Sequence, residues 1–345
     1  MTKKTKSRKK RRLFISLVLI AMLAIGAFAV LLSYLASTNS PVNAGNSEII
    51  NVEIPKGSST EKIASILLEN QLTKSVSAFK LLSKIKGYDG TYKSGFYGLS
   101  QSMSMEEIMI ALQKGTAITV RFTIPEGFDI KKITERLASE NLINPERFSL
   151  QVEQGVFDYK FLKDAPAGKE RLEGYLYPDT YEVFPDSSEE QIIDKMLSRF
   201  NQVFTDAYYA RAEELGMSIG EVMTLASIIE REAIIPEDRA IISSVFHNRL
   251  KIKMPLQSCA TVQFILGDQK AKLTNKDIAI DSPYNTYIID GLPPGPICSP
   301  GIASIEAALY PEDTNYLYFL AKGDGSSVFS VTYEDFLKNK DAYIN

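Results

Sequence analysis

The spacing of hydrophobic residues changes several times along the chain, and it begins with an unbroken apolar run. Residues 13–35 include no charged residue. A helix of that length, at about 1.5 Å per residue, is long enough to cross a hydrocarbon core of about 30 Å. The apolar region of a cleavable signal peptide is shorter, about 7–15 residues. The pattern therefore predicts a transmembrane helix that the mature protein retains.

A short pattern then occurs twice. The motif Ile54-Pro55-Lys56-Gly57 returns as Ile124-Pro125-Glu126-Gly127, and the apolar positions that follow also match without gaps. Each copy predicts a strand, a Pro-Gly turn and an amphipathic helix, which begins near Ser59 in the first copy and near Asp129 in the second. Two copies are too few for a solenoid, which needs three or more.

Between the two copies, residues 91–97 alternate like a strand and residues 104–115 predict a helix. Residues 48–118 are thus expected to form a small α+β module. This module resembles LysM, a glycan-binding fold, although the repeat is equally consistent with a unit that only packs.

Aromatic residues and prolines become frequent from residue 172 onward. Tyr175 and Tyr177 stand two positions apart, which predicts that they share one face of a strand. An aromatic face suits stacking on sugar rings, but half-buried residues of any sheet give the same pattern.

The remaining pattern is mostly helical. It predicts helices over 223–234, 239–250 and 302–309, a hairpin of strands over 316–319 and 328–331, and loops over 255–257, 281–287 and 291–296. The expected fold class is α+β: an N-terminal transmembrane helix, a small LysM-like α+β module and a mixed α/β domain.

Glu230 is an acid on an otherwise apolar helix. On that helix its neighbours are Met223, Ala226, Ala233 and Ile234. Desolvation disfavours the charged form of a carboxyl, and a carboxyl that stays protonated near neutral pH can act as a general acid. The alternative is that Glu230 pairs with a buried arginine and braces the core.

Charge is distributed unevenly. Residues 1–12 contain eight lysines and arginines and no acid, which places the N-terminus in the cytoplasm and the rest of the chain outside. The whole chain has 39 basic and 42 acidic residues, so the part beyond this tail has 31 and 42, a net charge of −11. This balance argues against a nucleic-acid partner and makes the tail a topology signal.

Composition also limits the chemistry. With His247 as the single histidine, a metal site built from several histidines is excluded, and no cofactor or metal is expected. No Gly-rich phosphate loop is present, so carboxylate chemistry remains. Cys259 and Cys298 can form a disulfide outside the membrane, but the sequence does not decide this.

Five ordered motifs resemble the YceG-like family of endolytic murein transglycosylases. They span residues 173–181, 226–232, 248–250, 284–287 and 291–295. The resemblance implies a bacterial cell-membrane enzyme that cuts peptidoglycan strands internally and leaves 1,6-anhydro-N-acetylmuramic acid ends. It also implies work beside peptidoglycan synthases, limiting the length of new strands. The catalytic acid of the family matches Glu230, and a second motif acid matches Glu173.

The chain departs from the family pattern at two places. Ser258 and Cys259 stand where an Asp often follows the Leu-Gln loop, and Asp335 follows Glu334 where a His is common. These departures make a ligand role for those positions doubtful but leave Glu230 untouched.

One acid is enough for the implied reaction, because N-acetylmuramic acid carries its own nucleophile, the C6 hydroxyl. Glu230 would protonate the bridging oxygen and then accept the C6 proton as the ring closes. Seven residues are candidates to hold the sugars: Glu173, Tyr175, Tyr177, Gln257, Tyr284, Asn285 and Tyr287. Each of them can equally be a packing residue.

Two alternatives stay open. A muramidase would use Glu173 or Asp179 as a second carboxylate and consume water. A non-catalytic protein would be a membrane-tethered glycan-binding scaffold. The expected organisation is a basic tail (1–12), a transmembrane helix (13–35), a linker (36–47), the LysM-like module (48–118), a connecting α/β segment that holds the second repeat (119–171) and a catalytic domain (172–345).

Overall fold

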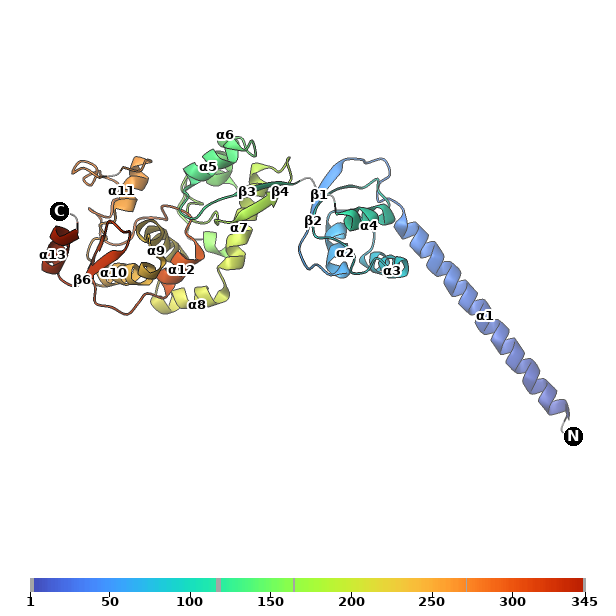
Figure 1. The fold of residues 1–345 in the computed structure, drawn as a ribbon. Coiled ribbons are helices and arrows are strands. Elements are labelled where there is room, and N and C mark those ends of the chain that lie inside the picture. The colour runs from blue at the N-terminus through green and yellow to red at the C-terminus, as the bar shows by residue number, and fades with distance from the viewer. Residues whose placement is uncertain (1–2, 116–118, 164, 271, 344–345) are drawn as a thin grey trace. The chain divides into compact units, whose positions relative to one another are not determined.

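The computed structural model describes residues 3–115, 119–163, 165–270 and 272–343, with side chains for residues 19–31 and from residue 33 on. The chain divides after Val120 into two compact units, unit 1 before this point and unit 2 after it. Residues 121–171 therefore belong to the same compact unit as residues 172–345. The mixed α and β elements are drawn in Figure 1.

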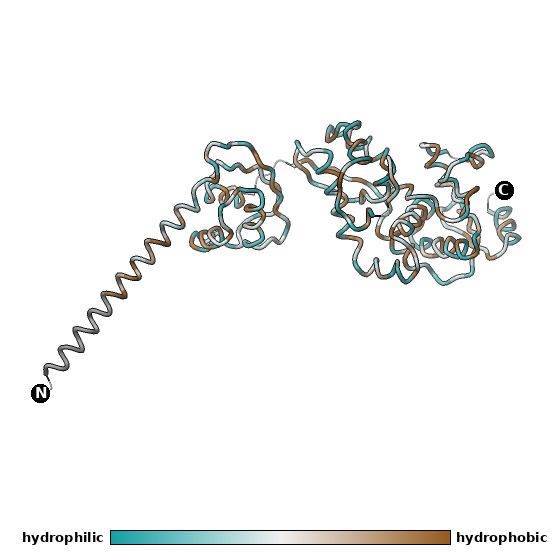
Figure 2. The backbone as a smooth tube through the Cα atoms, turned by 180° about the vertical axis from the view of Figure 1, so that it is seen from behind, coloured by the Kyte–Doolittle hydropathy of each residue, from teal (hydrophilic) through white to brown (hydrophobic). Residues whose placement is uncertain are grey.

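Helix α1, Lys3–Asn39, contains the apolar run. Among the described residues it is the one helix long and apolar enough to cross a membrane, over Leu19–Asn39, and Figure 2 shows its mainly apolar colouring. The end of α1 is bonded to the rest of unit 1, because Asn39 Oδ1 accepts a 3.0 Å hydrogen bond from the Glu106 amide. Residues 36–39, expected in the linker, are therefore helical.

Unit 1 consists of one small sheet with helices packed on it. Its elements after α1 are β1 (Ile49–Ile54), α2 (Thr60–Glu69), α3 (Val76–Lys86), β2 (Gly95–Ser100) and α4 (Met105–Lys114). Strands β1 and β2 are antiparallel, with Val52 opposite Tyr97. The predicted strand over 91–97 is confirmed only from Gly95 on, while the helix over 104–115 is confirmed by the Ser104 capping box and by Gly115 in the left-handed conformation.

Unit 2 is mainly helical. Its elements are β3 (Val120–Thr123), α5 (Ile130–Ser139), α6 (Pro145–Gln154), β4 (Thr180–Val183), α7 (Glu189–Val203), α8 (Asp206–Leu215), α9 (Ile219–Glu232), α10 (Arg239–Lys251), α11 (Cys259–Leu266), α12 (Ile302–Leu309), β5 (Tyr318–Ala321), β6 (Ser327–Ser330) and α13 (Tyr333–Tyr343), with 3-10 turns at Lys160–Leu162 and Pro236–Asp238. Strand β3 pairs with β4, and β5 pairs with β6.

Helix α9 is the centre of the core of unit 2. Every residue from Val222 to Ile229 is buried. Helices α10, α11 and α12 pack around it, and α12 makes the most extensive contact (Figure 1). Because neighbouring helices surround α9, the side chains on its last turn are held in fixed positions.

The repeat seen in the sequence is a repeat of structure. In both copies a glycine with positive φ, Gly57 at 80° and Gly127 at 75°, makes the turn after the strand. The helix then begins at a capping side chain, Ser59 in α2 and Asp129 in α5, as predicted. One copy lies in each unit.

The prediction of a strand through Tyr175 and Tyr177 is wrong. Backbone hydrogen bonds from residue i to i−3 run through this segment, including those of the Glu173 and Tyr175 amides, so it is a series of turns. Gly174, at a φ of 83°, also leaves the extended conformation. The strand β4 begins only at Thr180.

The helical predictions are confirmed. Helix α10 matches the predicted 239–250, and α12 begins and ends where predicted. Helix α9 ends at Glu232, two residues earlier than expected. The hairpin is β5–β6, in which Phe319 lies opposite Phe329.

Candidate active site

Glu230 lies in the last turn of α9, where the buried helix reaches the surface. The helix begins at a capping box formed by Ser218 and Glu221 and ends at Glu232, with Ala233 as the C-cap. The Glu230 side chain is 9% exposed. Met223 and Ala226, on the preceding turns, are fully buried, but Ile234 is 69% exposed and gives Glu230 no apolar cover.

The carboxyl of Glu230 has polar partners. Its Oε2 accepts hydrogen bonds from the Gly301 amide (3.1 Å) and from Ser304 Oγ (2.7 Å), both at the N-terminus of α12. Its Oε1 lies 3.9 Å from Arg239 Nη2, and Arg239 Nε donates to Ser304 Oγ at 3.1 Å. The expectation of wholly apolar surroundings is therefore wrong at the carboxyl end of the side chain.

This geometry leaves the two carboxyl oxygens in different situations. Oε2 is fixed by two donors and by the positive end of the α12 dipole. Among the described residues, Oε1 has only the distant guanidinium of Arg239, at the edge of ion-pair range. A proton or a substrate oxygen can therefore approach Oε1 without breaking a hydrogen bond.

A second carboxyl, that of Glu126, lies beside the same helix end. A Cβ atom placed on Gly301 would lie 2.0 Å from Glu126 Oε1, so only glycine permits this approach. Partial burial and the nearby charge of Glu230 raise the pKa of Glu126, while Arg239 opposes the shift. Glu126, Glu230 and Arg239 therefore form one electrostatic cluster.

The turn that carries Glu126 is tied to the segment before α12. The Gly127 amide donates to Ser299 O at 2.9 Å, and the Ser299 amide donates to Phe128 O at 2.7 Å. Arg231 Nη1, next to Glu230, donates to Gly127 O at 3.3 Å. These bonds hold the second repeat turn against α9 and the segment before α12.

Tyr177 lies close to this cluster. Burial raises the pKa of Tyr177, Arg199 lowers it, and the charge of Glu126 raises it further. Asp179 is paired with Arg199 at 2.7 Å. Of the predicted sugar-binding residues, Tyr177 is thus the one that the structure brings near Glu126, although its side chain is buried. Asp179, which was expected as a possible second carboxylate, is already paired with Arg199.

Glu173 lies apart from the cluster and is only 3% exposed. Its Oε2 accepts a 3.0 Å hydrogen bond from the Ile130 amide, at the start of α5. Burial raises the pKa of Glu173 to about 8. Glu173 therefore anchors α5, the helix that follows the Glu126 turn.

Two predicted sugar-binding residues belong to the core. Tyr175 is fully buried and packs on the rings of Phe161 and Phe200, each with its centroid 5.5 Å away. Asn285 is also fully buried, and its amide donates to Ile278 O and Ile280 O. Neither side chain has a surface to offer to a sugar, so the expectation of a binding role is corrected for both.

Three other candidates keep accessible surface. Gln257 is exposed and has a φ of 49°. Tyr287 lies 3.1 Å from the thiol of Cys259, and burial raises the pKa of Tyr287. Tyr284 packs beside Phe264 and is partly exposed. Both cysteines are free; Cys259 is exposed and Cys298 is buried.

The described residues contain no group of three or more His, Cys, Asp or Glu side chains arranged to hold a metal ion. The single histidine, His247, pairs with the Ala308 carbonyl at 2.9 Å through Nε2. The side chains gathered at the end of α9 are two carboxyls, a guanidinium and a hydroxyl.

Comparison with known proteins gives the relationship. A sequence model of the YceG-like family matches residues 52–342. The chain belongs to the YceG-like family. It is 39% identical over 324 residues to a protein of Bacillus subtilis (strain 168) named endolytic murein transglycosylase, covering 90% of this chain and 89% of the relative.

Two further relatives agree with this assignment. An endolytic murein transglycosylase of Streptococcus pneumoniae (D39) is 31% identical over 95% of this chain, which spans 64% of that protein's length. A solved structure of a YceG-like protein from Listeria monocytogenes has a TM-score of 0.57 and 38% identity, covering 85% of this chain and 99% of the other.

Sequence reasoning missed Glu126, Arg239, Gly301 and Ser304. One signal was available: the two repeat motifs differ at a single position, which is Lys56 in the first copy and Glu126 in the second. Because the glycine of each turn has a similar φ, this charge reversal is the feature of the motif that sets the two turns apart.

Proposed function

We propose that this YceG-like protein is a membrane-anchored lytic transglycosylase, which cleaves the bond between N-acetylmuramic acid and N-acetylglucosamine within peptidoglycan strands and leaves 1,6-anhydro ends. The observation that carries the proposal is the Glu230 carboxyl, with one oxygen fixed by α12 and the other free to exchange a proton. The names of the relatives support the substrate.

The first step uses the free oxygen. Protonated Glu230 donates from Oε1 to the bridging oxygen, and the bond between that oxygen and C1 of N-acetylmuramic acid breaks. The electron pair leaves with the N-acetylglucosamine hydroxyl, and positive charge develops on the muramic ring. The carboxylate that remains on Glu230 is stabilised by Gly301, Ser304 and Arg239.

The second step closes the ring. The C6 hydroxyl of the same sugar attacks C1 and gives its proton to Glu230, which restores the acid, and no water is consumed. Because nucleophile and electrophile belong to one residue, proximity favours closure. Glu126, when ionised, stabilises the positive ring through its charge.

A hydrolase is the second candidate, and one observation favours it. Glycosidases that consume water use two carboxyls, and the structure brings Glu126 to the catalytic end of α9. Glu126 therefore replaces Glu173 and Asp179 as the candidate second carboxylate, because Glu173 is buried against α5 and Asp179 is paired with Arg199.

The test uses the full chain in detergent with purified, uncross-linked glycan strands. Mass spectrometry of the products separates the two reactions, because hydrolysis adds one water to each cut and ring closure adds none. Glu230→Gln should reduce cleavage by at least about 100-fold while the thermal unfolding transition stays in place. The matched control is Glu237→Gln, an exposed acid in the next turn of chain.

Three outcomes decide between the candidates. Anhydro products that vanish with Glu230→Gln support the proposal. Products that carry the added water make the protein a muramidase. Unchanged cleavage in Glu230→Gln would reject Glu230 as the catalytic acid.

Two features support a location at the cell membrane. Helix α1 is apolar over Leu19–Asn39 and follows a basic tail, which supports a single-pass anchor with a cytoplasmic N-terminus and units 1 and 2 outside. The order β1-α2-α3-β2 supports a LysM-like, glycan-binding role for unit 1, and work beside peptidoglycan synthases follows from the same location. Protease added to spheroplasts should digest both units.

A further inference from the structure

Two neighbouring cavities lie between α5 and α11, beside the candidate active site. The large cavity, about 660 Å³, is lined by α5, α6, residues 169–173 and the ring pair of Phe264 and Tyr284. The small cavity, about 270 Å³, shares Lys131 and Phe264 with it and continues to Arg231, the residue after Glu230. Together they form one groove, here named the α5–α11 groove.

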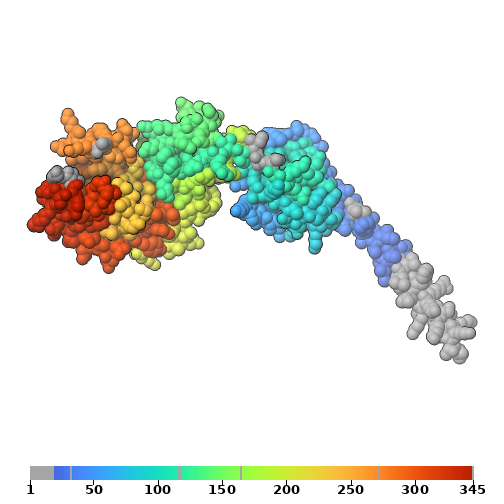
Figure 3. Space-filling model, viewed as in Figure 1, coloured from blue at the N-terminus to red at the C-terminus, as the bar shows by residue number. Residues whose placement is uncertain are grey.

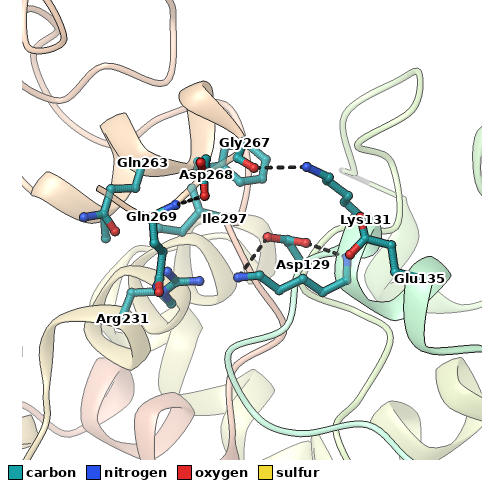
Figure 4. A pocket seen from close by; sticks show the side chains of 12 residues that line it. Asp129, Lys131, Glu135, Arg231, Gln263, Gly267, Asp268, Gln269 and Ile297 are labelled. Carbon is teal, nitrogen blue, oxygen red and sulfur yellow. Dashed lines mark hydrogen bonds and ion pairs between the residues drawn. The ribbon is translucent and has the colours of Figure 1, made fainter. Parts of the chain in front are cut away.

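The groove runs over one face of unit 2. Figure 3 shows the green atoms of α5 and α6 next to the orange atoms around α11. In Figure 4 the side chains of Asp129, Lys131 and Glu135 face Gln263 and Asp268 across the small cavity, with Arg231 at its inner end.

The walls of the groove are charged with both signs. The cations are Lys131, Lys132, Lys169 and Arg231, and the anions are Asp129, Glu135, Glu170 and Asp268. A strand of N-acetylated sugars carries no charge once its lactyl groups are linked to peptides. The charges of peptidoglycan are on the stem peptides, which carry carboxylates and an amine. Charge complementarity therefore matches the groove to a stem rather than to the sugars.

The floor of the large cavity holds a group that lacks a partner. Glu173 is 3% exposed, and its Oε1 has no hydrogen-bond partner among the described residues, while Oε2 is bonded to the Ile130 amide. With a pKa of about 8, this carboxyl is protonated at neutral pH and has an O–H to donate. A buried donor without a partner is costly, and a ligand carbonyl would satisfy it.

One contact crosses the groove. Lys131 Nζ, on α5, donates to Gly267 O, at the end of α11, at 3.1 Å. The bond joins two exposed groups and is weak, so an incoming carboxylate can replace the carbonyl as the partner of Lys131.

We propose that the α5–α11 groove binds the peptide stem of the muramic acid residue held at Glu230. Lys131 binds a stem carboxylate, Glu135 faces its amine, and the rings of Phe264 and Tyr284 pack on the alanine methyl groups. The assignment rests on the proposed function, because a stem enters the groove only when its sugar occupies the active site.

The test compares two substrates with the full chain in detergent. One is uncross-linked strands with their stems, and the other is the same strands after an amidase has removed the stems. We expect kcat/KM to be at least about tenfold higher with stems, since charge-assisted hydrogen bonds are involved. Lys131→Glu should abolish most of this preference by slowing only the stem-bearing substrate. The control is Lys276→Glu, an exposed lysine outside both cavities.

Equal cleavage of the two substrates by the wild type would overturn the proposal, and so would an equal loss on both substrates with Lys131→Glu. A binding measurement with an inactive variant tests the stem-binding proposal even if the proposed function is wrong. Glu230→Gln should bind stem-bearing strands at least about tenfold more tightly than stripped strands, and adding Lys131→Glu should remove the difference. If neither substrate is cleaved, the proposed function fails, while the binding ratio still decides for or against the stem.

Discussion

Replacing Gly301 with alanine would displace Glu126 without altering its charge. The added Cβ would lie 2.0 Å from Glu126 Oε1 and 2.2 Å from its Cδ, far inside van der Waals contact. The Glu126 carboxyl would therefore have to move by about 1–1.5 Å or more. The backbone need not change, because the φ of −74° and ψ of 168° at Gly301 suit alanine.

The expected cost in stability is small. A forced change of side-chain torsion costs about 0.5–1.5 kcal/mol, and alanine is a poorer N-cap than glycine by up to about 1 kcal/mol. Alanine also has less conformational freedom than glycine in the unfolded chain, which stabilises the folded protein by about 0.4–1 kcal/mol. Gly301→Ala should thus lower the free energy of unfolding by about 1–2 kcal/mol at most, a shift in Tm of a few degrees.

The expected effect on catalysis is larger than the effect on stability. If Glu126 stabilises the positive ring, its displacement should lower kcat by about 10- to 100-fold, as Glu126→Gln should. Release of cut strands is measured alongside thermal unfolding. Gly323→Ala is the control, because that glycine is exposed, has no atom near its added Cβ and is not in the left-handed region.

A double variant decides whether the methyl group acts through Glu126. If it does, Gly301→Ala combined with Glu126→Gln should be no slower than the slower single variant. Losses that multiply would show that the methyl group acts on the substrate directly. Wild-type activity in both single variants would refute a catalytic role for Glu126.

Three further predictions follow from the same unit. Ser304→Ala removes the 2.7 Å donor to Glu230 and should lower kcat about tenfold with little change in Tm. The pKa of Glu173 is about 8 in the folded chain and about 4.5 in the unfolded chain. The unfolded chain therefore loses this proton first as the pH rises, and the free energy of unfolding should fall between pH 5 and 8 by up to about 5 kcal/mol. Urea titrations should show this fall, and Glu173→Gln should flatten it. A thiol reagent should modify exposed Cys259 in the native chain and buried Cys298 only after unfolding; fast labelling of both would contradict the structure.

The elements that the sequence predicted well are those whose signals are local. Helix α12 and the starts of α2 and α5 depend on capping residues and on apolar spacing within a few turns, and all begin where expected. The segment around Tyr175 failed because a series of i to i−3 turns also places bulky residues at short, regular intervals. The left-handed φ of Gly174 separates this series of turns from a strand, but the sequence shows only a glycine, and glycine also occurs in strands.

The active site was predicted as far as one residue could define it. Glu230 was proposed from its own helix, but its hydrogen-bond donors Gly301 and Ser304 lie more than 70 positions away, and no periodic pattern links Glu126 or Ser304 to it. The predicted apolar surroundings were right at Met223, Ala226 and Ala233, and wrong at Ile234 and at the carboxyl. The spacing of residues along α9 shows which side chains flank Glu230 on the same helix. It does not show that the N-terminus of another helix, α12, packs against the Glu230 carboxyl.

The repeat explains how the second carboxyl reaches the site. A strand, a Gly turn and a capped helix form the repeated unit, and the glycine of each copy has a similar positive φ. In unit 2 the turn is bonded on both sides to the segment that leads into α12, and α12 in turn fixes Glu230 through Gly301. The site therefore depends on three short-range devices, a turn, a helix cap and a glycine without a side chain, which together place two acids and one arginine at a single helix end.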